Sequence, residues 1–170
     1  MQDNGTFRVW VGCLACYNEG RLVGEWFDAA DAPQDMDDFV ERVKHPSATT
    51  HEELWCFDIE NSPVDGEMSP MDAVKYAEMI ENLDIPLGAL TAWLDNHHEK
   101  LSEDAIEQAT DAYIGDSEDA LDECYEGVYP EGDLPEWARS SYSDIIANIR
   151  QSDRVGGGWY EHGGYYYWAI

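Results

Sequence analysis

Two cysteines, Cys13 and Cys16, have the spacing of one half of a zinc site. A structural zinc ion is held by four ligands, and the second half is usually another closely spaced pair. The remaining candidate ligands, which only folding could bring to this pair, are Cys56, Cys124, His45 and His51. Nothing in the spacing of those residues indicates a second pair. Since Cys13 and Cys16 fall in an apolar, strand-like stretch, we expect buried free thiols and no metal site.

The other motifs that could serve catalysis or bind a cofactor are weak. Pairs of carboxylates arise by chance in a chain with 37 Asp and Glu residues. The acidic run at 116–123 lacks the central Gly and terminal Glu of a calcium loop. Gly156–Gly158 precedes a hairpin rather than a helix, so it does not match a phosphate-binding loop, and no basic groove accompanies the aromatic run Tyr165–Trp168. We therefore expect no catalytic residue, no cofactor and no enzyme activity.

The most unusual stretch of the chain is its acidic run from Asp111 to Pro130, which no Lys, Arg or His interrupts. Ser117 is a plausible N-cap, and the apolar residues that follow recur at helical spacing. The acids Asp119, Asp122 and Glu123 then lie on the opposite face, where like charges repel one another. A charge run is usually a solvated face, but the absence of salt-bridge partners favours a functional purpose.

The whole chain shares this bias: 37 acidic and 9 basic residues give a net charge of −28. DNA and membrane headgroups are anionic and should repel such a surface, so its expected partners are basic proteins, including those with a DNA-binding groove. Duplex DNA carries one charge per about 1.7 Å of axis, so this charge matches about 48 Å of duplex, close to the size of a compact chain of this length. Mimicry of DNA is thus feasible.

Composition limits the remaining possibilities. A hydrophobic content of 44% and an aromatic content of 12% exclude a disordered acidic tail. No apolar run approaches 18 residues and no basic segment precedes a hydrophobic one, so we expect no membrane span, no signal peptide and a cytoplasmic protein.

The pattern of elements predicts an α+β fold made of three small domains. The first, 1–62, combines a hairpin (Phe7–Tyr17 and Arg21–Phe27), a helix (Asp31–Lys44) and a strand (Leu54–Ile59) in a small antiparallel sheet with one helix packed on it. The second, 63–102, is a central helical domain whose helices begin near Ser69 and Pro86. The third, 103–170, is an α+β domain of helices and a terminal hairpin over Trp159–Ile170.

Several segments also resemble the ArdA-type antirestriction proteins. The sequence V-W-V-G-C-L-A-C-Y-N-E-G-R-L-V-G-E-W-F-D (Val9–Asp28) is similar to that family's opening strand, Y-N-x-G turn and following strand. D-A-Y-I-G (Asp111–Gly115) resembles the D-x-Y-x-G segment that begins its C-terminal domain. Leu134-Pro135, the helix around Tyr142 and the aromatic last strand also fit, so the similarity spans essentially the whole chain.

The resemblance implies a function without catalysis. ArdA proteins are elongated, dimeric, three-domain mimics of bent B-form DNA that occupy the DNA-binding groove of Type I restriction–modification enzymes. They thereby protect incoming DNA of plasmids, transposons and phages, and their partner is the enzyme rather than nucleic acid or a membrane. The resemblance places the homodimer contact in the C-terminal domain, at Ala112, Tyr113, Ile114, Gly115, Asp116 and Ser117.

Acids along exposed helix faces are the expected phosphate mimics, because carboxylates there can meet the Lys and Arg of a DNA groove. The expected set, called here the mimic acids, is Asp35, Asp37, Asp38, Glu41, Glu78, Glu81, Glu103, Asp104, Glu107, Asp119, Asp122, Glu123 and Glu126. Two alternatives stay open: an acidic scaffold that binds another basic protein, and salt adaptation. Salt adaptation predicts acids spread evenly over the surface, whereas a mimic predicts a continuous acidic ridge.

Overall fold

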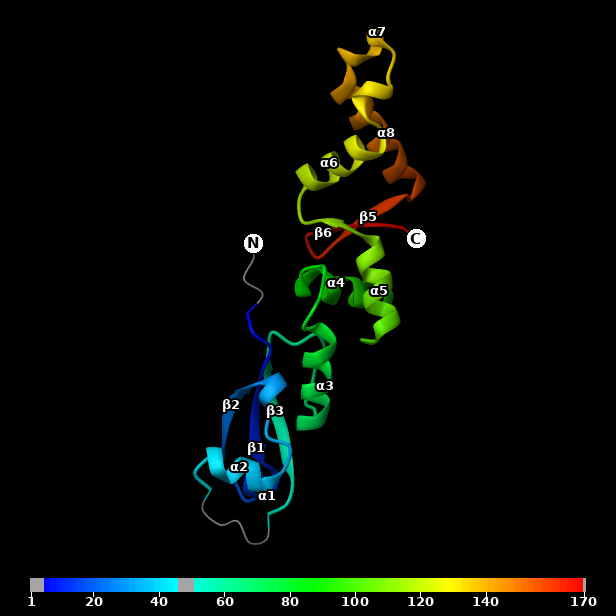
Figure 1. The fold of residues 1–170 in the computed structure, drawn as a ribbon. Coiled ribbons are helices and arrows are strands. Elements are labelled where there is room, and N and C mark those ends of the chain that lie inside the picture. Colours follow the sequence, from blue (N-terminus) through cyan, green and yellow to red (C-terminus); the bar gives the residue numbers. More distant parts are fainter. Residues whose placement is uncertain (1–4, 46–50, 170) are drawn as a thin grey trace. The chain divides into compact units, whose positions relative to one another are not determined.

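The computed structural model describes residues 5–45 and 51–169 and is mixed α and β, as the sequence predicts (Figure 1). It divides into two compact units, Met1–Leu87 and Gly88–Ile170. Each unit is built around one three-stranded antiparallel sheet. Within the described residues, no helix is long and apolar enough to cross a membrane.

The first unit is organised around strand β1 (Arg8–Cys13), which lies between β2 (Gly24–Asp28) and β3 (Leu54–Glu60). Val9 and Val11 alternate with outward-facing residues and are fully buried, as expected for a strand with one face on a core. The predicted first strand is too long, because helix α1 (Leu14–Asn18) begins where the strand was expected to continue. The Cys13 side chain caps this helix, and that local hydrogen bond turns the chain out of the sheet.

Two helices and one 3₁₀ turn cover this sheet: η1 (Ala29–Asp31), α2 (Met36–Arg42) and α3 (Pro70–Ile80). The single helix predicted over Asp31–Lys44 is therefore wrong at its start, because Pro33 separates η1 from α2. The predicted start of α3 is confirmed, with Ser69 as N-cap and Pro70 in the first turn. Phe39 of α2 and Ala73 of α3 are both fully buried in the same core as β1.

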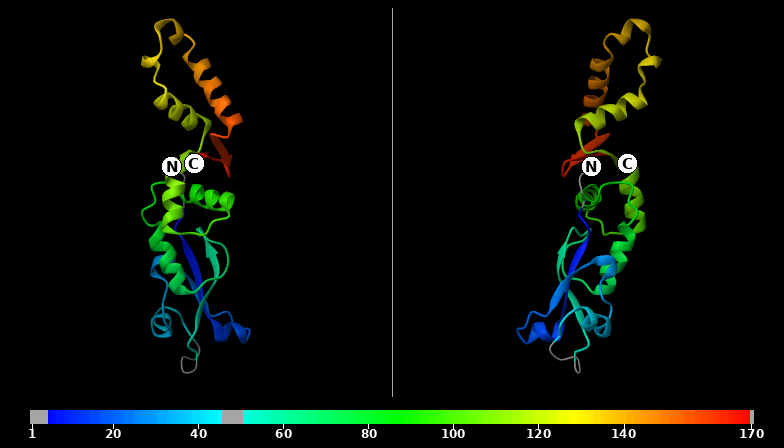
Figure 2. Two further views of the ribbon diagram at one scale, coloured as in Figure 1. Left: turned by 90° about the vertical axis from the view of Figure 1, so that its right-hand side faces the viewer. Right: turned by 60° about the vertical axis from the view of Figure 1, so that its left-hand side comes forward.

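The second unit contains the remaining elements. They are α4 (Leu87–His97), α5 (Glu103–Ala112), β4 (Tyr113–Gly115), α6 (Glu118–Val128), η2 (Glu131–Asp133), α7 (Glu136–Arg139), α8 (Tyr142–Gly156), β5 (Trp159–His162) and β6 (Tyr165–Trp168). The strand order is β4-β6-β5, so the predicted terminal hairpin is confirmed and β4 adds a third strand to it. Within this unit the sheet lies between α4 and α5 on one side and α6 and α8 on the other (Figure 2).

Aromatic residues hold the second sheet to its helices. Tyr167 is fully buried in β6, and its hydroxyl donates a hydrogen bond of 2.7 Å to the Ala89 carbonyl oxygen of α4. On the other side, Leu121 and Tyr125 of α6 form a core with Ile146 of α8. The hydrogen bond to Ala89 offsets the cost of burying the Tyr167 hydroxyl. The division into three domains at 62 and 102 stays a prediction.

Candidate functional site

Helix α2 projects its acids to solvent because its apolar residues Met36 and Phe39, three positions apart, are buried. Asp37 and Glu41 are exposed, on the side of the helix away from the core. Their positions follow from the same 3.6-residue period that buries Phe39.

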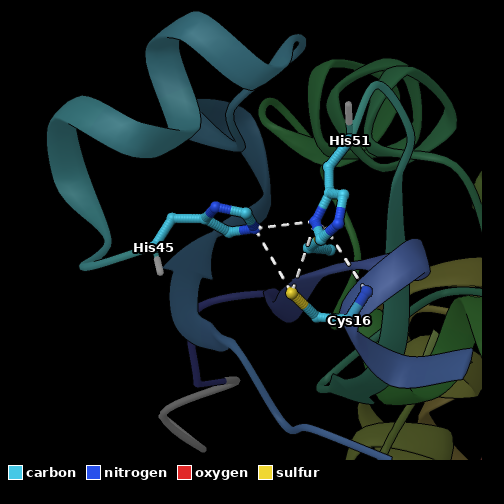
Figure 3. A group of neighbouring side chains, drawn as sticks. Cys16, His45 and His51 are labelled. Atoms are coloured by element: carbon cyan, nitrogen blue, oxygen red, sulfur yellow. Dashed lines mark hydrogen bonds between the residues drawn. The ribbon is translucent and has the colours of Figure 1, made fainter. Parts of the chain in front are cut away.

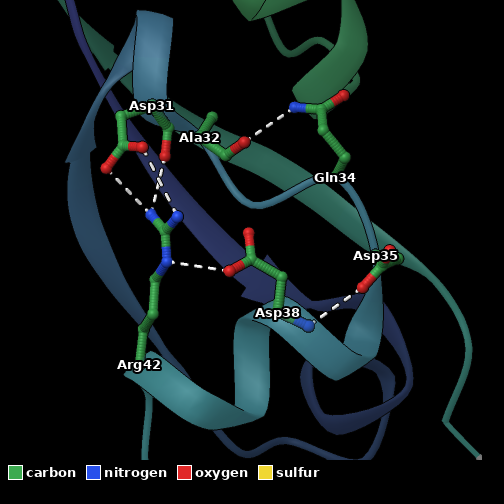
Figure 4. Close-up of polar contacts among 6 residues, drawn as sticks. All are labelled: Asp31, Ala32, Gln34, Asp35, Asp38 and Arg42. Atoms are coloured by element: carbon green, nitrogen blue, oxygen red, sulfur yellow. Dashed lines mark hydrogen bonds and ion pairs between the residues drawn. The ribbon is translucent and has the colours of Figure 1, made fainter.

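Two further mimic acids of α2 already have partners within the chain (Figure 4). The Asp35 carboxylate caps the helix by accepting a hydrogen bond of 2.9 Å from the backbone N–H of Asp38. The half-buried Asp38 carboxylate accepts from the Arg42 guanidinium at 2.9 Å, and Arg42 also pairs with Asp31 at 2.9 Å. Asp38 thus carries less uncompensated charge than its neighbours on α2.

Helix α3 carries fewer of the mimic acids. Glu78 is exposed in its last turns, and Glu81, at its C-cap, is exposed as well. The helix dipole disfavours negative charge at a C-terminus, so these two acids lie where local electrostatics work against them.

Helix α5 carries three exposed mimic acids: Glu103, Asp104 and Glu107. The hydroxyl of Ser102 caps the helix by accepting a hydrogen bond of 3.1 Å from the backbone N–H of Ala105. The buried face consists of alanines, including Ala105 and Ala109, so the helix packs closely while every acid of this group faces solvent. Glu103 and Asp104 lie in the first turn, where the helix dipole favours them.

Helix α6 repeats this arrangement within the acidic run. Ser117 caps it by accepting a hydrogen bond of 3.2 Å from the backbone N–H of Ala120. Leu121 and Tyr125 are buried on one face, and the exposed acids of the opposite face are Asp119, Glu123 and Glu126. The faces predicted for this helix are therefore confirmed. Asp122 differs, because it is half-buried and its carboxylate accepts from the Arg150 guanidinium at 2.6 Å.

Few cations neutralise these faces. The ion pairs of Arg8 and Arg21 involve acids outside the set, and Arg139 donates to backbone carbonyls instead. Within residues 5–45 and 51–169, only Asp38 and Asp122 among the mimic acids form an ion pair. The structure therefore leaves most of these carboxylates uncompensated, and such a surface attracts a basic partner over a long range.

The expected dimer segment, Ala112–Ser117, ends α5, forms β4 and caps α6. Ala112 and Gly115 are buried, Tyr113, Ile114 and Ser117 are half-buried, and Asp116 is exposed. A Cβ at Gly115 would lie 2.4 Å from the Ala120 Cβ, so only glycine fits between β4 and α6. Burial, with the Asp116 carboxylate nearby, raises the pKa of the Tyr113 phenol.

Strand β4 lies at the edge of its sheet. It pairs with β6 through Tyr113 and Gly115, and its other side faces no strand in the described part of the chain. An edge strand presents unpaired backbone N–H and C=O groups that another chain can meet.

Sequence reasoning named two histidines, His45 and His51, as candidate ligands and set them aside because of their spacing. The structure nevertheless brings both histidines to Cys13 and Cys16. The available signal was their separation: five residues lie between the two histidines, which is within the range of zinc-finger histidine pairs.

Comparison with known proteins supports the expected family. No curated protein sequence gives a significant match. The family model described as "Antirestriction protein (ArdA)" matches residues 9–163, from β1 into the terminal hairpin, and so includes all the mimic acids and the expected dimer segment. The resemblance inferred from the sequence is confirmed: the chain belongs to the ArdA family of antirestriction proteins.

Proposed function

We propose that this protein mimics B-form DNA and occupies the DNA-binding groove of a Type I restriction–modification enzyme, which it thereby inhibits. The observation that carries the proposal is the set of exposed acids on α2, α5 and α6, most of which lack a cation partner within the described residues. Membership of an antirestriction family supports the same target class. Protection of DNA that enters the cytoplasm on a mobile genetic element follows from this inhibition.

The spacing of the acids suits the role. Three or four residues of α-helix advance about 4.5–6 Å, which is the separation between successive acids on one face. One strand of B-DNA carries a charge about every 3.4 Å of axis, so a helix face approaches but does not equal its charge density. Glu103 and Glu107 in α5, and Asp119, Glu123 and Glu126 in α6, follow this spacing.

The energetics of binding then resemble those of DNA itself. Lys and Arg in a DNA groove are placed to neutralise phosphates, and carboxylates at similar positions make charge-assisted hydrogen bonds to the same groups. Contacts of this kind accelerate association and weaken as salt rises. Since phosphate contacts carry no base information, one mimic is expected to inhibit enzymes that recognise different DNA sequences.

A homodimer extends the mimic. We place the contact between chains at Ala112–Ser117, where β4 offers an unpaired edge and β6 occupies the other side. Two chains would carry the charge of about 95 Å of duplex at the spacing of B-DNA.

The experiment that tests the function is protection of unmodified phage in cells. The protein is expressed in a host with an active Type I restriction–modification enzyme and in the same host without it, and phage plating is compared. The expected result is restored plating only in the restricting host. A folded, expressed protein that leaves restriction unchanged would contradict the proposal and favour an acidic scaffold for another basic protein.

A further inference from the structure

Four potential metal ligands from separate segments meet in the first unit. Cys13 ends β1 and Cys16 lies in α1, whereas His45 follows α2 and His51 precedes β3. One atom from each side chain, two sulfurs and two ring nitrogens, lies within 4.8 Å of all the others. The four residues thus converge on one point although they are up to 38 positions apart in the sequence.

The ligand atoms lie at short distances from one another (Figure 3). His51 Nδ1 lies 3.3 Å from Cys13 Sγ and 3.5 Å from Cys16 Sγ. His45 Nε2 lies 3.3 Å from Cys16 Sγ and 3.3 Å from His51 Nδ1. In Figure 3 the two rings point their nitrogens toward the Cys16 sulfur from different sides.

These four separations match four of the six edges of a zinc tetrahedron, and all six lie within 4.8 Å. With Zn–S bonds of about 2.3 Å and Zn–N bonds of about 2.0–2.1 Å, a tetrahedral ion separates sulfur from nitrogen by about 3.5 Å and the two nitrogens by about 3.4 Å. The observed values of 3.3–3.5 Å and 3.3 Å agree with this geometry. We propose that Cys13, Cys16, His45 and His51 bind a zinc ion.

The fold prepares the cysteine half of the site. The backbone N–H of Cys16 donates to Cys13 Sγ at 3.4 Å, so the Cys13 sulfur is held at the first turn of α1, the helix that carries Cys16. The form of each cysteine that binds metal is the thiolate.

The first sheet positions His51, and helix α2 contacts His45. Cys13 pairs with Leu54 in the β1–β3 register, and the Leu14 N–H donates to the Glu53 carbonyl oxygen at 3.0 Å. This places the segment before β3, and with it His51, beside the end of β1. The ring of His45 meets the ring of Phe39 edge to face, with centroids 6.2 Å apart.

Burial and ligand number assign the ion a structural role. The exposed fractions of Cys13, Cys16 and His51 are 1%, 0% and 8%. Four protein ligands fill a tetrahedral zinc ion and leave no open position for a substrate or water. The ion would tie the ends of β1 and β3 to α1 and to the chain that follows α2, and its binding energy would add to the folding free energy of the unit.

The test starts from the full-length protein, purified under reducing conditions without chelator. Zinc content is measured by mass spectrometry, and the metal-free protein is then titrated with cobalt alone. The expected results are one zinc per chain and a cobalt spectrum with the visible bands of tetrahedral coordination and a thiolate-to-cobalt charge-transfer band. Absence of metal from the folded, reduced protein, with no cobalt spectrum, would overturn the proposal, as would a Cys13–Cys16 disulfide that persists under reductant.

Variants then test the ligand set. Cys16→Ser should weaken the charge-transfer band and His45→Ala should weaken cobalt affinity by at least tenfold, whereas Cys124→Ser and His98→Ala, which change the same residue types in the second unit, should change neither. If a ligand variant fails to fold, the unaltered protein gives the readout instead: a chelator should lower its melting temperature and added zinc should restore it. A chelator that leaves the melting temperature unchanged, or a His45→Ala protein with the unaltered cobalt spectrum, would refute the four-ligand site.

Discussion

Arg150 Nη1 lies 2.6 Å from Asp122 Oδ1 and connects α8 to α6 across 28 positions of the sequence. Asp122 therefore differs from the other acids of its helix face, since its charge is already compensated within the chain. The same holds for Asp38, which pairs with Arg42 at 2.9 Å. A mimic that works through uncompensated charge should depend less on these two acids than on their neighbours.

This difference predicts the effect of removing the cation. Arg150→Gln adds one unit of net negative charge and frees the Asp122 carboxylate, so inhibition should strengthen and depend more steeply on salt. The matched control is Arg8→Gln, which removes the same charge from the first sheet, where Arg8 lies 3.8 Å from Asp28 and 3.7 Å from Glu60. Affinity for a Type I enzyme is measured for both variants at several salt concentrations. Weaker inhibition by a correctly folded Arg150→Gln protein would contradict the account.

Charge on the mimic acids should act as a group. Single neutralisations such as Asp119→Asn should weaken binding by about 0.2–1 kcal/mol, less than about fivefold, as for exposed ion pairs. The triple change Glu103→Gln, Asp104→Asn and Glu107→Gln should weaken it by about tenfold or more and flatten the salt dependence.

The control for this triple change removes equal charge from strands: Glu25→Gln, Asp58→Asn and Glu161→Gln, all exposed in β2, β3 and β5. Equal loss of affinity in both triples would mean that net charge alone decides binding. A single neutralisation that abolishes binding, in a folded dimer, would argue against distributed charge.

The close contact between Gly115 and Ala120 predicts a rescue experiment. Gly115→Ala should destabilise the second unit by about 1–3 kcal/mol, because the new methyl group overlaps the Ala120 Cβ at 2.4 Å. Adding Ala120→Gly should recover part of this loss, even though glycine within a helix costs about 1 kcal/mol. Urea unfolding of the two single variants and the double variant gives the coupling free energy between positions 115 and 120. Additive effects would show that the two positions do not clash.

The helix caps predict a further set of stabilities. Ser102→Ala and Ser117→Ala should each destabilise the chain by about 1 kcal/mol, because the hydroxyls accept hydrogen bonds from the N–H groups of Ala105 and Ala120 at 3.1 and 3.2 Å. Ser141→Ala is the control, since Ser141 precedes α8 without a side-chain capping bond. Thermal unfolding compares the three. If Ser141→Ala lowers the stability as much as Ser117→Ala does, the assignment of Ser117 as a capping residue is contradicted.

The elements that local chemistry determines could be predicted from the sequence. Ser69, Ser102 and Ser117 mark helix starts because a hydroxyl beside a helical pattern satisfies free N–H groups, and each caps its helix in the structure. The exposure of the acids on α6 likewise follows from the period of Leu121 and Tyr125.

Features that depend on distant parts of the chain were not predicted. β4 has three residues, too few for a strand pattern, and exists because β6 pairs with it. The approach of His45 and His51 to Cys13 depends on the β1–β3 register and on α2, neither of which spacing alone reveals.

The most direct test of the DNA-mimic account is competition for the groove. A Type I restriction–modification enzyme is bound to a labelled duplex, and the purified protein is titrated in at low and at moderate salt. The account predicts stoichiometric displacement of the duplex at low salt and weaker displacement as salt rises. Failure of the folded protein to displace the duplex at any salt concentration would contradict it.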